Sequence, residues 1–293
     1  MEYSRLIVAI VTPFDKNLEL DLTRAKELAQ RLVKDGVTGF VVNGTTGECP
    51  TVAREEKISM IRCIKEAVNV PVIAGTGTYN TSESIQYTKD AEAAGADGIM
   101  LVTPYYSKPD QDMLYEHFGA IASVTKLPVM LYNIPGRSVV NIDVNTTLRL
   151  ARDFKNIRCM KEASGNLDAL TCLVRDCPEG FLCYTGEDSL TLPTLAVGGY
   201  GAVSVAGHIV APQMKAMIEA YVNGNVKEAQ KLHVALQAVN RALFLQPNPT
   251  PVKKALELSG FGVGGLRAPL REASAAVTEE HKKAMANLNL LRN

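Results

Sequence analysis

The chain has 293 residues, of which 46% are hydrophobic, and its 31 basic residues balance its 31 acidic residues. This length suits one large domain or a domain with an appendage, since barrels of more than about 200 residues commonly form a single domain. The formal net charge of zero excludes the basic surplus typical of proteins that bind nucleic acid or anionic membranes, so we expect neither partner.

Eight short apolar runs follow one another along the chain and predict β-strands. Each run is apolar at most positions and does not alternate, which is typical of parallel strands covered on both faces. The predicted strands span residues 6–11, 39–42, 70–74, 98–102, 128–132, 157–161, 181–185 and 202–205.

Amphipathic segments with helical spacing lie between these runs. They span 22–34, 54–67, 82–94, 113–124, 144–151, 167–175 and 190–197. Gly36 and Gly95 each follow such a segment, where glycine supplies the left-handed residue that ends a helix. Eight strand–helix units favour an α/β fold, a closed (β/α)8 TIM barrel, over an open doubly wound sheet.

The rest of the chain has helical apolar spacing over 213–223, 227–245, 251–258 and 279–290. The first segment is predicted to be the eighth barrel helix. We therefore predict a catalytic barrel over residues 1–224 and a C-terminal helical region over 225–293. The expected roles of this second region are packing and subunit contact.

Neither membrane insertion nor metal binding is expected. No apolar run reaches the roughly 20 residues that span a bilayer, and the run at 6–11 is too short for a secretory signal, so we expect a cytoplasmic protein. The six cysteines form no C-x-x-C pair and the four histidines have no paired helical spacing. Reduced cysteines and no catalytic metal are therefore expected.

Lys161 is the sharpest candidate for catalysis, because it closes a predicted strand and functional residues of such barrels gather at the C-terminal strand ends. A lysine deprived of water has a lowered pKa and offers a neutral amine to a ketone. The resulting iminium is an electron sink that makes the adjacent carbon acidic. The alternative is a strand-end lysine that extends to solvent or pairs with Glu162.

Other polar residues follow the neighbouring predicted strands. The Tyr132 phenol could relay a proton, although a lone buried tyrosine is more often simply packed. Thr45 and Thr46, between two glycines, could bind a carboxylate or form an ordinary turn. Arg137 could hold a second carboxylate or remain solvated. The pair at 105–106 could equally pack at a subunit interface.

Together these motifs closely resemble the dihydrodipicolinate synthase family, and the resemblance covers nearly the whole chain. It rests on GTTGE at 44–48, YNIPGRS at 132–138, KEASGN at 161–166 and PNPTPVK at 247–253. The Gly-x-x-Gly-Glu, Tyr-Asn-x-Pro and Lys elements are shared by a wider superfamily of pyruvate-dependent lyases. That superfamily includes N-acetylneuraminate lyase and keto-deoxy sugar acid aldolases. Arg137 is the residue that distinguishes the synthase family within it.

The resemblance implies a carbon–carbon bond-forming lyase of the diaminopimelate and lysine pathway. Pyruvate would form a Schiff base with Lys161, and its enamine would attack the aldehyde of L-aspartate 4-semialdehyde, whose carboxylate Arg137 would bind. Tyr132 would shuttle protons, linked to solvent through Thr45 and through Tyr106 of a neighbouring subunit.

The resemblance also implies how pyruvate is held and how the chains assemble. Thr46 and the backbone around Gly186 and Val203 would shape the pyruvate end of the site. Family members are usually homotetramers built as dimers of dimers, and no cofactor or metal is needed.

The chain departs from feedback-regulated members of the family at the place where lysine binds them. Arg54 and Lys57 stand where those members have histidines, and Tyr79 stands where asparagine is usual, while Glu83 and Tyr105 are kept. Two cations are poor hosts for a cationic ligand. Weak or absent inhibition by lysine is therefore expected.

Three alternatives differ in their chemistry. Another pyruvate-dependent aldolase would keep Lys161 but use a different aldehyde, and this alternative is disfavoured by Arg137. A metal- or phosphate-dependent barrel enzyme is disfavoured by the scattered histidines and by Glu187 and Asp188, whose charges would repel phosphate. A binding protein on a former enzyme scaffold is disfavoured by the complete set of candidate residues.

Overall fold

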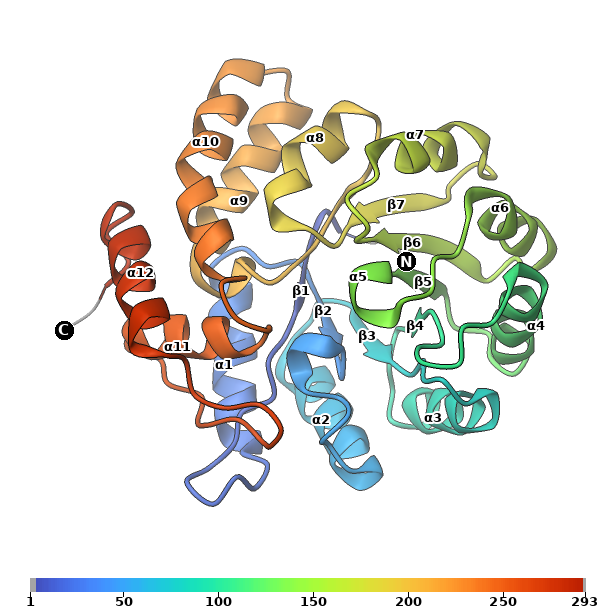
Figure 1. Cartoon of the computed structure of the whole chain (residues 1–293), viewed down its shortest axis with the longest axis horizontal. Coiled ribbons are helices and arrows are strands. Elements are labelled where there is room, and N and C mark those ends of the chain that lie inside the picture. The colour runs from blue at the N-terminus through green and yellow to red at the C-terminus, as the bar shows by residue number, and fades with distance from the viewer. Residues whose placement is uncertain (1–3, 292–293) are drawn as a thin grey trace.

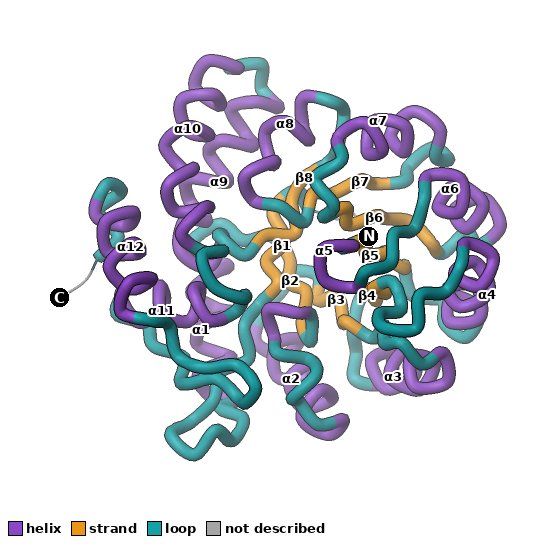
Figure 2. Tube along the Cα trace, viewed as in Figure 1, coloured by secondary structure: helices purple, strands orange, loops and turns teal. Residues whose placement is uncertain are grey.

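Eight parallel strands close into a barrel in the order β1 to β8, with β8 pairing back to β1. The computed structural model describes residues 4–291. Figures 1 and 2 show the ring of strands with helices around it, so the predicted (β/α)8 barrel is confirmed. The strands are β1 (Leu6–Ala9), β2 (Gly39–Val42), β3 (Val72–Gly75), β4 (Gly98–Val102), β5 (Val129–Asn133), β6 (Ile157–Glu162), β7 (Leu182–Thr185) and β8 (Gly201–Ser204).

One helix follows each strand and covers the outside of the barrel. These helices are α1 (Leu22–Lys34), α2 (Arg54–Ala67), α3 (Thr81–Ala93), α4 (Gln111–Ala122), α6 (Val144–Asp153), α7 (Leu167–Asp176), α8 (Thr191–Ala196) and α9 (Gly207–Val222). Three short helical turns interrupt the loops after β2, β5 and β7, namely η1 (Thr45–Gly47), α5 (Pro135–Ser138) and η2 (Asp188–Leu190). All three lie where the candidate site residues were expected.

Short polar side chains begin many of the helices. Each accepts a hydrogen bond from a backbone N–H of the first turn, which satisfies a donor that has no partner within the helix. The residues that do so at α1, α3, α4, α6 and α7 are Asp21, Asn80, Asp110, Asp143 and Asn166. The bounds of α1 and α2 agree with the prediction.

Two helices begin four or more residues earlier than the periodicity predicted. α9 begins at Gly207 rather than 213, because the helix includes Pro212 and bends at Val210, whose backbone is not helical. α12 (Ala275–Ala286) begins after Ser274, whose hydroxyl accepts a hydrogen bond from the N–H of Val277. The prediction of 279–290 was wrong at both ends, since it relied on apolar spacing and overlooked this cap.

Strand side chains alternate between two cores. Cys159 and Lys161 of β6 share the inner face, whereas Met160 between them belongs to the core between strands and helices. Lys161 is thus directed into the barrel by its place two residues after an inward-facing side chain. The inner core consists of Ile7, Ala9, Val41, Ile73, Met100, Met130, Tyr132, Cys159, Tyr184 and Val203.

The C-terminal helices α10 (Val226–Ala242), α11 (Thr250–Leu258) and α12 lie beside α9 and α1 at one side of the barrel (Figure 1). Their buried side chains, among them Leu236, Val252 and Met285, continue the helix-facing core of the barrel. No helix within residues 4–291 is long and apolar enough to cross a membrane.

Candidate active site

Lys161 lies at the C-terminal end of β6, in register with Tyr132 on β5 and Tyr184 on β7. Its side chain is buried at 5% exposure, and its Nζ lies 4.1 Å from the centre of the Tyr132 ring. Glu162 instead accepts hydrogen bonds from the Ser164 N–H at 2.6 Å and the Asn133 amide at 3.0 Å. A solvated Lys161 is therefore the wrong interpretation, because the side chain lies inside the barrel mouth.

Burial lowers the pKa of Lys161 to about 8, from an ordinary value of 10.5. The charge of Asp188 opposes this shift, and the charge of Arg137 contributes to it. A pKa of about 8 leaves a much larger neutral fraction near pH 7 than an exposed lysine has, by roughly 300-fold for a shift of this size. The neutral amine is the form that attacks a carbonyl carbon.

Gly186 follows β7 and leaves room for the lysine side chain. A Cβ atom at this position would lie 2.8 Å from Cε of Lys161 and 2.7 Å from Cβ of Ala163. Real Cβ atoms do not approach other atoms so closely, so a side chain here would displace the amine. The requirement for glycine at 186 arises from this close approach and not from an unusual backbone angle.

Tyr132 brings a protonated phenol to the same face of the barrel. Burial raises its pKa to about 12, and a hydrogen bond with the Thr45 side chain opposes the rise. The phenol is therefore protonated near neutral pH, and it is linked to the loop after β2 through Thr45. This arrangement suits proton transfer beside an amine that gains and loses bonds.

Asp188 is a site residue that the sequence analysis did not assign to catalysis. Its carboxylate is buried and accepts hydrogen bonds from Ser204 Oγ at 2.5 Å and from the N–H groups of Val205 and Ala206 at 3.0 and 2.8 Å. Burial raises its pKa, and its charge acts on Lys161. Its position two residues after the required Gly186 was the available signal in the sequence.

The remaining residues expected to bind substrate lie around the same end of the barrel. Thr46 is buried in η1, and its Oγ1 accepts a hydrogen bond from the Asn248 amide at 2.8 Å. Arg137 is exposed on the short helix α5, and its charge acts on both Tyr132 and Lys161. Val203 lies on β8 with its side chain in the inner core.

Tyr106 does not join this group within one chain. It is 92% exposed, and its backbone has a φ of 74°, in the left-handed region that bulky side chains rarely adopt. Its neighbour Tyr105 instead packs edge-on against Tyr79, with ring centres 5.2 Å apart. Within one chain, the Tyr106 ring thus lies in solvent.

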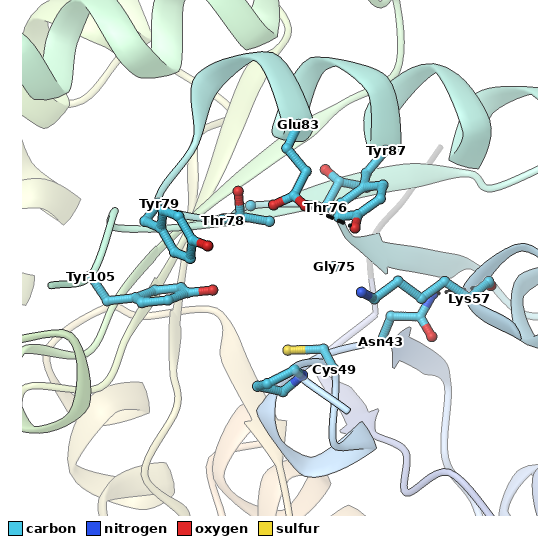
Figure 3. A pocket seen from close by; sticks show the side chains of 12 residues that line it. Asn43, Cys49, Lys57, Gly75, Thr76, Thr78, Tyr79, Glu83, Tyr87 and Tyr105 are labelled. Carbon is cyan, nitrogen blue, oxygen red and sulfur yellow. Dashed lines mark hydrogen bonds between the residues drawn. The ribbon is translucent and has the colours of Figure 1, made fainter. Parts of the chain in front are cut away.

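A cavity of about 290 Å³ lies between α2, α3 and the loops after β2, β3 and β4. Figure 3 shows the Lys57 amine on one side of this space and the Tyr79 and Tyr105 hydroxyls on the other. Glu83 also lines it and accepts a hydrogen bond from Tyr87 at 3.1 Å.

The expectation of two free cations at this cavity is wrong for Arg54. Its guanidinium is paired with Asp90 through hydrogen bonds of 2.6 and 2.8 Å, and it does not line the cavity in Figure 3. The Lys57 amine instead lies 4.7 Å from the centre of the Tyr87 ring and faces the cavity. Lys57 alone therefore supplies the positive charge among the described lining residues.

Comparison with known proteins gives the family. The model of the dihydrodipicolinate synthetase family matches residues 2–288. A protein of Desulforamulus reducens named 4-hydroxy-tetrahydrodipicolinate synthase is 49% identical over 99% of both chains. The chain belongs to the dihydrodipicolinate synthetase family, which confirms both the resemblance seen in the sequence and its assignment to the lyases.

Solved structures agree with this family over the whole barrel. A dihydrodipicolinate synthase from Cyanidioschyzon merolae with lysine bound has a TM-score of 0.96 at 42% identity, with 98% of this chain and 99% of that chain covered. A chloride-inhibited dihydrodipicolinate synthase from Acinetobacter baumannii complexed with pyruvate has a TM-score of 0.95 at 34% identity, covering 98% and 99%. Both structural matches include the C-terminal helices.

Proposed function

We propose that the chain is a cytoplasmic enzyme that condenses pyruvate with L-aspartate 4-semialdehyde through a Schiff base on Lys161, in the diaminopimelate branch of lysine biosynthesis. The observation that carries the proposal is the buried Lys161 amine, with a pKa lowered to about 8, next to the Tyr132 phenol. The relatives' common name and the pyruvate complex of the Acinetobacter protein support the same pair of substrates.

The reaction begins when the neutral Lys161 amine attacks the ketone carbon of pyruvate. Water leaves and a protonated iminium remains, which withdraws electrons from the methyl carbon. Loss of a methyl proton gives an enamine, which forms the new bond to the aldehyde carbon of the second substrate. That substrate's amino group then replaces Lys161 on the former ketone carbon, which closes a ring and frees the enzyme.

The surrounding residues have separate roles in this scheme. Tyr132 gives and takes the protons of these steps, in contact with Thr45. Thr46, with the backbone at Gly186 and Val203, binds the pyruvate end. The exposed guanidinium of Arg137 binds the carboxylate of the semialdehyde in a two-pronged contact.

Tyr106 completes the site from another copy of the chain, in a homotetramer arranged as a dimer of dimers. The support is the exposure of this ring and its left-handed backbone, because an aromatic ring this exposed gains little packing from the described residues of its own chain to offset the backbone strain. In the assembly, the phenol would extend the proton path from Tyr132 and Thr45 toward solvent.

An aldehyde panel tests the proposed reaction. With pyruvate fixed, we expect turnover with aspartate semialdehyde and little with N-acetylmannosamine or sugar-derived aldehydes. Arg137→Ala should raise the KM for the semialdehyde by about 10- to 100-fold, the loss expected for a charge-assisted contact, and change the KM for pyruvate much less. Preference for a sugar aldehyde would instead indicate a pyruvate aldolase of another specificity.

Free lysine is expected to inhibit this enzyme weakly or not at all. The Lys57 amine faces the cavity of Figure 3 and would repel the cationic ends of lysine, while the Glu83 carboxylate is already engaged by Tyr87. Initial rates measured at fixed pyruvate across a lysine titration check this. The matched variant Lys57→His should gain sensitivity, and strong inhibition of the unmodified enzyme would contradict the expectation.

A further inference from the structure

The C-terminal helical region reaches the active-site loop through a side chain. Asn248, just before α11, donates a hydrogen bond from Nδ2 to Oγ1 of Thr46 at 2.8 Å. The two residues are 202 positions apart in the sequence, and both are buried. A hydrogen bond between two buried side chains fixes their mutual orientation more strongly than one exposed to water.

The direction of this hydrogen bond has a chemical consequence for Thr46. A hydroxyl has one proton to donate and lone pairs that accept. Because Thr46 Oγ1 accepts from Asn248, its own proton is free to be donated elsewhere, and none of residues 4–291 accepts it. Asn248 Oδ1 is likewise buried without a partner in this part of the chain.

A second contact holds the same two segments together. Glu48, two residues after Thr46, forms an ion pair with Lys253 of α11 at 2.6 Å. The other carboxylate oxygen of Glu48 accepts the N–H of Arg267 at 3.0 Å. These contacts of Glu48 also hold the loop that carries Thr46 against the segment that carries Asn248. They therefore keep the Asn248 amide within hydrogen-bonding distance of Thr46.

We propose that Asn248 is a positioning residue for recognition of the pyruvate carboxylate, which acts by making the Thr46 hydroxyl a donor toward the barrel mouth. The inference rests on the proposed function, because it takes pyruvate as the ligand of Thr46. It gives the C-terminal region a part in substrate binding beyond packing and subunit contact.

The test measures how much pyruvate is needed for half-maximal borohydride trapping of the adduct on Lys161, together with KM and kcat in steady-state assays. Asn248→Ala should raise half-saturation by about 5- to 30-fold, as expected for loss of one buried hydrogen bond. Asn248→Asp should raise it at least as far, because its carboxylate can only accept and would take the Thr46 proton for itself. The KM for the aldehyde should change little.

A double-mutant cycle shows whether Asn248 acts through the hydroxyl. Thr46→Val should raise the half-saturating concentration by itself, and adding Asn248→Ala should then have no further effect. In a Thr46→Ser background, which keeps a hydroxyl, Asn248→Ala should still raise the half-saturating concentration. Asn240→Ala is a matched control, since Asn240 is also a buried asparagine of the C-terminal region, with its Oδ1 likewise unpartnered among the described residues, and the amide bound to Thr46 is that of Asn248. It should leave half-saturation unchanged.

Several outcomes would overturn the inference. If Asn248→Asp needed the same pyruvate concentration for half-maximal trapping as the unmodified enzyme, the Thr46 hydroxyl proton would already be directed at residue 248 in the unmodified enzyme. Additive effects of Asn248→Ala and Thr46→Val would show an effect independent of the hydroxyl. If Asn248→Ala does not fold, Asn248→Asp measured with and without Thr46→Val decides alone, because its effect should disappear when the hydroxyl is absent. Failure of the unmodified enzyme to trap pyruvate at any concentration would instead reject the proposed function.

Discussion

Replacement of Lys161 by arginine is expected to lower kcat by at least about 10⁴-fold, because the guanidinium keeps the positive charge but cannot form the covalent intermediate. Borohydride reduction in the presence of pyruvate should then leave the variant unlabelled. In the unmodified chain, peptide mapping should place the adduct on Lys161.

Lys253 is the internal control in the same experiment. It is also a buried lysine whose pKa is lowered by loss of water, but its amine is held by Glu48 and by the Gly265 carbonyl at 2.7 Å. Burial alone would therefore label both residues, whereas a catalytic site labels Lys161. An adduct on Lys253, or on neither residue, would contradict the mechanism.

The pH dependence of trapping follows from the lowered pKa of Lys161. The neutral amine is the reactive form, so the rate should rise with pH and level off above the pKa of about 8. An amine with the ordinary pKa of 10.5 would still be gaining reactivity well above that point. Single-turnover trapping from about pH 6 to pH 10 distinguishes the two curves.

Replacement of Lys253 by methionine is expected to lower the free energy of unfolding by roughly 3–5 kcal/mol. The Lys253 and Glu48 side chains are 2% and 0% exposed, and methionine would leave the Glu48 carboxylate buried without its counter-charge. The lost ammonium also packs 4.3 Å from the centre of the Phe14 ring. Urea unfolding at a fixed protein concentration measures the change, with the slope checked for two-state behaviour.

Lys254→Met is the matched control for the change in side-chain chemistry. Lys254 is the next residue of α11 and pairs with Glu257, whose side chain is 58% exposed, so its loss should cost no more than about 1 kcal/mol. The double variant Glu48→Gln with Lys253→Met should regain part of the stability, because no buried charge is left unpaired. If Lys253→Met and Lys254→Met lowered the free energy of unfolding equally, the buried ion pair would contribute no more to stability than the exposed one.

The position of Lys161 was predictable because two local rules agree. The apolar run before it predicts a buried strand, and the order of strands and helices predicts a barrel whose functional residues gather at the C-terminal strand ends. The inward direction of its side chain then follows from the two-residue period of a strand, with Cys159 on the same face. Tyr132 is found by the same reasoning on the adjacent strand.

The ends of α1 were predictable because apolar spacing and an end signal coincide there. α1 has both, with Asp21 before it and Gly36 after it. α9 begins before Pro212 because the residues ahead of the proline form a turn stabilised by the barrel, which spacing alone does not reveal. The turns that carry Thr45 and Arg137 are too short to show any period.

The sequence by itself determined the order of strands and helices, the family and the candidate catalytic lysine, because strand burial, helix periodicity and motif residues are local properties of the chain. Only the tertiary structure decided which distant groups meet. Closure of the barrel and docking of α11 bring Asn248 to Thr46 and Lys253 to Glu48. The pairing of Arg54 with Asp90 removes one of the two cations expected at the cavity of Figure 3. Such contacts depend on the relative placement of whole elements, and no local pattern of residues encodes that placement.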